Sequence, residues 1–176
     1  MSDLAIPTER PQNVPARGAG PVLPRYRSEP LNRPKILSHG TLECRDMAAT
    51  RRFYEEFLGL ETVRHSKNSF KFRLGEYFAV VCHCMGDRAR KTVRANHWGL
   101  DLPSRADVDR AYELAHKYKE KYGIGEITRL IENETYSFYF SDLDGNWWEF
   151  QYAGDGQAEG WGRNDEHFDN GDFVPE

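Results

Sequence analysis

The chain reads SFYFSDLDGNWWEFQY from Ser137 to Tyr152, and this stretch holds two runs in which apolar and polar residues alternate. Successive side chains of a β-strand point to opposite faces, so alternation predicts strands with one apolar and one polar face. The first run places Tyr139 between two serines and sends its phenylalanines to the other face. The second run places Glu149 opposite Phe150. A slip of one residue would bury the charge and expose the rings, so the register is well specified.

Two earlier runs, residues 37–44 and 96–102, alternate in the same way. In the first of these, His39 shares its face with Thr41 and Glu43, whereas the leucine and cysteine between and beyond them fall on the opposite face. In the second, His97 shares its face with an aspartate, and the tryptophan and leucines turn away. Four strands are therefore predicted to have one apolar face and one polar face.

Three side chains on these polar faces, His39, His97 and Glu149, are the candidate metal ligands. Two imidazoles and one carboxylate leave coordination positions free, an arrangement typical of non-haem Fe(II) enzymes that activate oxygen. Taken singly, a strand histidine is more often an ordinary core or surface group, whereas a carboxylate among aromatic residues needs a partner. The sequence therefore predicts a catalytic metal site that binds Fe(II), with Mn(II) as an alternative because the same ligand set holds either metal.

The order of elements repeats along the chain. The first histidine run precedes a helical pattern that Asp46 caps and Gly59 ends, and the second precedes one that Ser104 caps and Gly123 ends. Three extended runs follow each helix, at about 61–66, 69–74 and 77–84, and then at about 126–132, 136–141 and 147–152. The predicted fold class is α+β, with two βαβββ modules at about residues 35–90 and 91–152. The two candidate histidine ligands open equivalent strands, as an internal duplication requires.

Composition limits the remaining possibilities. A chain of 176 residues is long enough for one compact domain with a substantial core. Three cysteines and the lack of an apolar leader at the start favour a reducing cytoplasmic setting. No apolar run is long enough to span a membrane. The net charge of −4 gives no reason to expect nucleic acid as a partner.

Prolines and charges set off both ends of the chain. Residues 1–34 hold seven of the nine prolines, which predicts an extended N-terminal arm. Residues 153–176 have seven acidic residues against one arginine, which predicts an acidic C-terminal tail. Trp161, Phe168 and Phe173 in this tail favour docking on the core or on a second subunit over disorder alone.

The histidine-bearing first strands, the helix end FYEEFLGL (53–60) and the run DLDGN (142–146) leading into Trp148, Glu149 and Phe150 resemble the vicinal oxygen chelate superfamily. The resemblance covers residues 35–152. It implies that the paired βαβββ modules form a cupped mixed sheet around a metal site. The superfamily includes glyoxalases, fosfomycin-resistance enzymes, epimerases and extradiol ring-cleaving dioxygenases, so the fold alone does not select a reaction.

Two further residues resemble the type I extradiol dioxygenases. His83 precedes His97 by 14 residues and Tyr139 precedes Glu149 by 10, close to the spacing of the acid–base histidine and active-site tyrosine of those enzymes. The resemblance implies an Fe(II)-dependent enzyme that cleaves a catechol ring with O₂ next to the diol, in the catabolism of aromatic compounds. His83 would transfer protons and Tyr139 would hold a substrate oxygen. Alternation also turns His83 away from the cysteines on either side of it.

The chain departs from the extradiol pattern at Leu143, where proline is usual, and at 130–132, where a histidine is expected. It is also too short for the second copy of the double module that many members have, and a homodimer could supply that packing surface. The alternative function is that of a glyoxalase-like metal-dependent isomerase, lyase or thiol transferase. Such enzymes usually add a fourth ligand on the strand around His83, and residues 77–84 contain no carboxylate. A metal-free binding module is a third possibility, although it would not need the three ligands.

Overall fold

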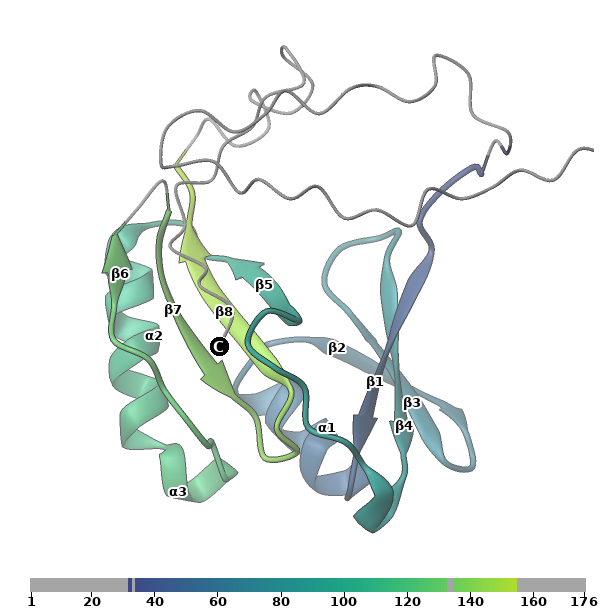
Figure 1. Ribbon diagram of the computed structural model, residues 1–176. Coiled ribbons are helices and arrows are strands. Elements are labelled where there is room, and N and C mark those ends of the chain that lie inside the picture. The colour runs from purple at the N-terminus through teal and green to yellow at the C-terminus, as the bar shows by residue number, and fades with distance from the viewer. Residues whose placement is uncertain (1–31, 33, 133–134, 155–176) are drawn as a thin grey trace, which may run out of the picture.

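Figure 1 shows the computed structural model of the protein, which describes residue 32 and residues 34–132 and 135–154. The predicted proline-rich arm and acidic tail lie almost wholly outside the described residues, so they remain predictions. No helix in the described part of the chain is long and apolar enough to cross a membrane.

The first half of the described chain forms one four-stranded sheet with a helix, here called module one. Its elements are β1 (His39–Cys44), α1 (Met47–Glu56), β2 (Glu61–Ser66), β3 (Ser69–Arg73) and β4 (Ala79–Cys84), followed by the short 3₁₀ helix η1 (Gly86–Arg88). The strand order is β1-β4-β3-β2, with β1 parallel to β4 and the other pairs antiparallel. Helix α1 provides the crossover that a parallel pair requires.

The second half repeats this arrangement as module two. Its elements are β5 (His97–Asp101), α2 (Arg105–Lys117), α3 (Lys119–Tyr122), β6 (Ile131–Glu132), β7 (Tyr136–Ser141) and β8 (Trp147–Tyr152). The strand order is β5-β8-β7-β6, the equivalent of the order in module one, and β5 is parallel to β8. The predicted α+β class and the two βαβββ modules are confirmed. In Figure 1, the two sheets lie side by side, with β5 and β1 both near the middle of the molecule.

One predicted strand is much shorter than expected. The run 126–132 forms β6 only at its last two residues, with an isolated bridge from Ile127 to Phe140. The backbone of this run still pairs with β7, as in the bond from the N–H of Thr128 to the carbonyl of Tyr139. Hydroxyl groups take part at other positions, because the backbone N–H of Glu126 donates to Ser141 Oγ and Thr128 Oγ1 accepts from the backbone N–H of Tyr139. Local side-chain bonds of this kind compete with a regular strand ladder.

The predicted helix boundaries are close to those observed. Asp46 caps α1 by accepting hydrogen bonds from the backbone of Ala48 and Ala49, and Ser104 caps α2 by accepting from Asp107. The second helical pattern breaks after Lys117 into α2 and α3. Gly123 ends α3 at a φ of +66°, a left-handed conformation that glycine adopts without the steric cost of a Cβ.

An aromatic core joins the two modules. Tyr54 of α1 packs edge-on against Phe72 of module one and Trp148 of module two, with ring centroids 4.8 and 5.3 Å apart. Phe57 likewise approaches Phe140 and Phe150 from β7 and β8. The rings that the alternation assigned to the inner faces are buried, so the predicted register of β7 and β8 is confirmed.

Buried polar groups connect the same two modules through the turn 142–146. Tyr54 donates from its hydroxyl to Asp142 (2.8 Å), and Thr50 donates to Asp144 (2.6 Å). The amide of Asn146 donates to the backbone carbonyl of Glu43 (3.0 Å). These buried groups have partners on the other module, so the two modules are expected to fold as one unit.

Candidate metal centre

The polar face of module two gathers a histidine, a glutamate and a tyrosine. Glu149 of β8 lies between Gly99 of β5 and Tyr139 of β7 in the strand register, and His97 opens β5 two residues before Gly99. A Cβ at Gly99 would lie 4.0 Å from Oε2 of Glu149, an ordinary contact distance. The imidazole Nε2 of His97 lies 3.3 Å from Oε2 of Glu149.

The ring of His97 is oriented from behind by the main chain. Its Nδ1 lies 2.8 Å from the backbone carbonyl oxygen of Arg94. A carbonyl oxygen only accepts hydrogen bonds, so Nδ1 carries the proton and Nε2 of the neutral ring has a lone pair directed at the Glu149 carboxylate. Two acceptors this close need a cation between them, which is either a second proton on the ring or a metal ion.

This pair fits a metal ion. Metal-binding histidines usually donate their second ring N–H to a carbonyl or carboxylate, as His97 does here. Two ligand atoms each about 2.1 Å from one ion at a right angle are about 3.0 Å apart, close to the observed separation of 3.3 Å. An imidazole nitrogen and a carboxylate oxygen are a donor set suited to Fe(II) and Mn(II).

The charges of His97 and Glu149 support each other. Burial raises the pKa of Glu149, but hydrogen bonds from His97, Ser137 and Tyr139 outweigh that effect and hold the pKa below its usual range. The hydrogen bond to Glu149 raises the pKa of His97, against the opposing effects of burial and of the Arg94 charge. Glu149 is therefore an anion at neutral pH and is available as a ligand.

Tyr139, predicted as an active-site residue, lies beside this pair. Its ring meets the imidazole of His97 edge-on, with centroids 4.9 Å apart and an interplanar angle of 83°. The side chain is half-buried on the same face as Glu149. Tyr139 is thus positioned to contact a molecule held at His97 and Glu149.

The other two predicted site residues lie on module one. His39 begins β1 and is exposed, and its Nδ1 lies 2.9 Å from the hydroxyl of Ser38. His83 is exposed on β4, and the register pairs it with Glu43 of β1, so both histidines share the polar face of that sheet. The neighbouring Cys82 is buried on the opposite face, so the predicted orientation of His83 is confirmed. In the ranges that the structure describes, no three His, Cys, Asp or Glu side chains form a group able to hold a metal.

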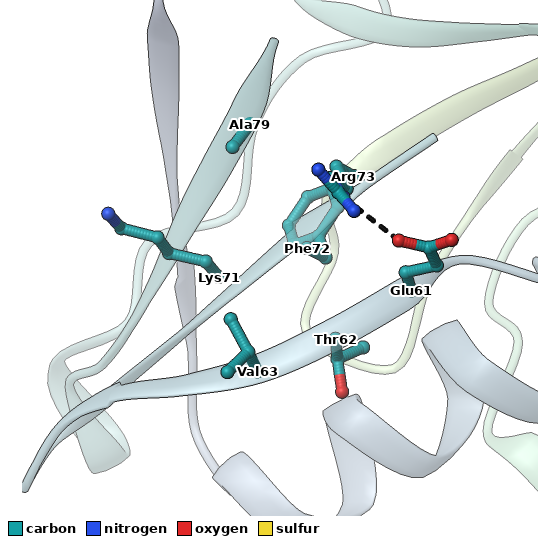
Figure 2. Close-up of a pocket in the computed structure, with 7 residues that line it drawn as sticks. All are labelled: Glu61, Thr62, Val63, Lys71, Phe72, Arg73 and Ala79. Atoms are coloured by element: carbon teal, nitrogen blue, oxygen red, sulfur yellow. Dashed lines mark hydrogen bonds and ion pairs between the residues drawn. The ribbon is translucent and has the colours of Figure 1, made fainter. Parts of the chain in front are cut away.

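The polar face of module one has a shallow pocket of about 300 Å³, and it is not the metal centre. It is lined by Glu61, Thr62, Val63, Lys71, Phe72, Arg73 and Ala79. Figure 2 shows that Arg73 and Glu61 face each other across its rim, and their charges pair at 2.9 Å. A second cavity of about 290 Å³ lies between the modules, where Phe78 and Trp98 contribute much of its wall.

The sequence reasoning missed the role of Arg94. Its carbonyl oxygen fixes the His97 ring, and its guanidinium carbon lies 5.9 Å from the centre of the Tyr139 ring. Arg94 precedes β5 and belongs to no periodic pattern, so alternation gave no signal for it. Ser137 was also not singled out, although it shares a face with Tyr139.

A family model described as the Glyoxalase/Bleomycin resistance protein/Dioxygenase superfamily matches residues 36–150. No curated protein sequence matches the chain. Among solved structures, the fosfomycin resistance protein FosX from Mesorhizobium loti is 24% identical with a TM-score of 0.52, over 68% of this chain and 93% of that one.

Two further solved structures are similar in fold. A glyoxalase/dioxygenase from Nostoc punctiforme is 20% identical with a TM-score of 0.54, over 67% of this chain and 90% of that one. A glyoxalase/bleomycin resistance protein/dioxygenase family enzyme from Burkholderia phytofirmans is 14% identical with a TM-score of 0.53, over 66% of this chain and 97% of that one. At these identities the likeness extends to the fold alone.

Proposed function

The chain belongs to the glyoxalase/bleomycin resistance protein/dioxygenase superfamily, and from this premise we propose that it is an Fe(II)-dependent extradiol dioxygenase of catechols. The supporting observation is the pair formed by His97 and Glu149, with the ring of Tyr139 against the imidazole. Mn(II) is the alternative metal in this proposal, because the same donors suit it. The free thiols of Cys44, Cys82 and Cys84 are consistent with a reducing compartment, and we place the enzyme in the cytoplasm.

We propose that a homodimer completes the metal centre, with His39 of the partner subunit as the third ligand. His39 and His83 both lie on the polar face of module one, so a partner subunit that docks this face would present both histidines to module two. Opposite net charges favour contact between module one of one subunit and module two of the other. Residues 35–90 have ten basic and seven acidic residues (+3), whereas residues 91–152 have eight and eleven (−3).

Each group in the completed site would then have a separate role in the reaction. Bound Fe(II) would supply Lewis acidity and an electron path between catechol and O₂. His83 of the partner subunit would accept a proton from a catechol hydroxyl and return it to the product, the general acid–base role that histidine most often has in enzymes. Tyr139 would hold a substrate oxygen by a hydrogen bond. The ring carbon–carbon bond next to the diol breaks and both oxygen atoms enter the product, so no other oxidant is needed.

The test is oxygen uptake by full-length protein loaded with Fe(II) under anaerobic conditions and then mixed with a set of catechols. We expect uptake with a yellow ring-opened product, and its loss in Glu149→Gln. The matched control is Glu113→Gln, which changes an exposed carboxylate of α2. Glu113→Gln should keep its metal and its activity.

Uptake that survives Glu149→Gln would contradict the assignment of this ligand. Metal-loaded protein that consumes no oxygen with any catechol would rule out the dioxygenase and favour the glyoxalase-like isomerase, lyase or transferase. Sedimentation velocity tests the dimer separately, because a monomer at micromolar concentration that still turns over catechol would exclude His39 of the partner subunit as a required ligand.

A further inference from the structure

Arg94 is a half-buried cation at the edge of the candidate metal centre. Its guanidinium lies over the ring of Tyr139, and the same ring meets the imidazole of His97. The Tyr139 ring therefore lies next to both the guanidinium of Arg94 and the imidazole of His97.

The guanidinium of Arg94 differs from the other half-buried arginines. Arg51 pairs with Glu55 at 2.9 Å, and Arg45 donates to the backbone carbonyl of Asp144. No carboxylate or carbonyl among the described residues accepts from the side chain of Arg94. Glu149 does not serve as its counter-ion, because that carboxylate is engaged by His97, Ser137 and Tyr139. Within the described ranges this partly desolvated charge has no anionic partner, and an oxyanion beside it would be stabilising.

We propose that Arg94 binds an anionic group of the substrate, so that the preferred substrate is a catechol with a carboxylate or another oxyanion on its ring or side chain. The inference rests on the proposed function and names the substrate class of that site. An arginine suits this role because its planar donors bind an oxyanion in pairs and its charge persists at all working pH values. The guanidinium carbon lies 5.9 Å from the centre of the Tyr139 ring, which places the charge beside a residue of the site.

The first experiment compares two ligands by anaerobic calorimetry on the Fe(II)-loaded full-length protein. The ligands are 3,4-dihydroxybenzoate, which has a carboxylate, and unsubstituted catechol, which has none. We expect Arg94→Gln to weaken binding of the dihydroxybenzoate by about 10–100-fold and that of catechol by less than about 2-fold, since charge-assisted hydrogen bonds are lost only for the first ligand. Arg94→Lys should recover part of the loss.

The matched control is Arg110→Gln, which removes an exposed arginine of α2 far along the sequence from the site. This variant should bind both ligands as the unchanged protein does. Equal losses for both ligands in Arg94→Gln, or no loss for either, would overturn the proposal. In turnover, the effect should fall on KM for the carboxylated catechol and leave kcat nearly unchanged.

A second experiment tests anion binding at Arg94 independently of the proposed dioxygenase activity. Metal-free full-length protein is titrated with inorganic phosphate while the side-chain Nε–Hε signals of the arginines are followed by NMR. The Arg94 signal should shift and saturate in the millimolar range, whereas the Arg110 signal should not. An Arg94 signal that moves no more than that of Arg110 would overturn the anion site, whatever the outcome of the oxygen-uptake assay.

Discussion

Module one and module two have the same strand order, but their polar faces have different residues at equivalent positions. His39 pairs with Ala79 at the start of module one, as His97 pairs with Trp147 at the start of module two. Two residues further along the second strand of each pair, module one has Val81 where module two has Glu149. On the next strand, Lys71 lies beside the valine as Tyr139 lies beside the glutamate.

The difference shows which part of the repeated fold is free to change. The inner faces are apolar in both modules, as at Cys82 and its equivalent Phe150, because both must pack against a helix and the shared core. The polar faces differ more. One of them holds two exposed histidines with Glu43, and the other holds His97 in contact with the buried Glu149.

Replacing Asp142 should disrupt the buried hydrogen bonds between the modules and have the largest effect on stability. Its carboxylate accepts from the hydroxyl of Tyr54 and the indole of Trp148, in addition to two backbone N–H groups of its own turn. Asp142→Ala leaves several buried donors without a partner, and we expect a loss of at least about 3 kcal/mol in the free energy of unfolding. Urea denaturation measures it.

The control for that experiment is Asp109→Ala, which removes an exposed carboxylate of α2 that accepts from Tyr136. Its denaturation midpoint should hardly move. Two separate transitions in Asp142→Ala would show that the modules then unfold independently. A single transition with an unchanged midpoint in Asp142→Ala would contradict the stabilising role of these hydrogen bonds.

Gly40 and Trp98 allow a second test of contact between the modules. A Cβ at Gly40 would lie 2.5 Å from the far end of the Trp98 ring, so Gly40→Ala forces the indole to move. We expect a loss of about 1–3 kcal/mol in stability, the usual cost of overpacking. Trp98→Phe shortens the ring, so Gly40→Ala should cost less in that background. A double-mutant cycle with no coupling would show that the two residues do not meet in solution.

Tyr54→Phe tests the same buried hydrogen bonds through the pH dependence of stability. Burial and the nearby charge of Asp142 raise the pKa of Tyr54 well above its usual value. The folded protein then holds this proton more tightly than the unfolded chain, so stability falls as pH rises above about 10, the usual tyrosine value. Tyr54→Phe should cost about 1.5 kcal/mol at neutral pH, from one lost hydrogen bond to a charged group.

The pH dependence is the sharper part of that experiment. The stability difference between the unchanged protein and Tyr54→Phe should shrink above pH 10, when denaturation is followed at several alkaline pH values. A difference that stays constant up to pH 11 would contradict the buried, protonated state of Tyr54.

Val81→Glu would sharpen the comparison by giving module one the carboxylate that module two has. In the proposed dimer this adds a fourth ligand, and we expect metal affinity to rise about tenfold and oxygen uptake to fall because a substrate position is filled. Val63→Glu is the control, since Val63 lies two strands away on the same face. Competition with a fluorescent chelator measures the affinity, and equal affinities in the two variants would contradict the proposed assembly.

Much of the fold could be predicted because strand alternation and helix capping are local. The faces of Glu149 and His83, the caps at Asp46 and Ser104, and the two βαβββ modules all follow from side-chain periodicity or short spacing. The prediction of a long strand at 126–132 was wrong outside Ile131 and Glu132, because alternation does not reveal that hydroxyl groups interrupt the backbone pairing of this run with β7.

The candidate site was less predictable from sequence. Parity assigns His39 and His97 to polar faces, but whether two faces meet depends on packing between sheets or between subunits. The structure brings together His97, Glu149 and Tyr139 and leaves His39 and His83 on the other module. Arg94 could not be predicted because a single residue before a strand has no period to identify it.

The hydrogen bond from Tyr54 to Asp142 also sets an order of events during synthesis. Its two residues are 88 positions apart, so the tyrosine leaves the ribosome long before its acceptor exists. At about 5–20 residues per second, the delay is roughly 4–18 s. During this interval module one can pair its own strands, but the hydroxyl that later becomes buried has only water as a partner. Tyr54 and Phe57 likewise lack the rings of module two that pack against them in the folded protein until that module has been made.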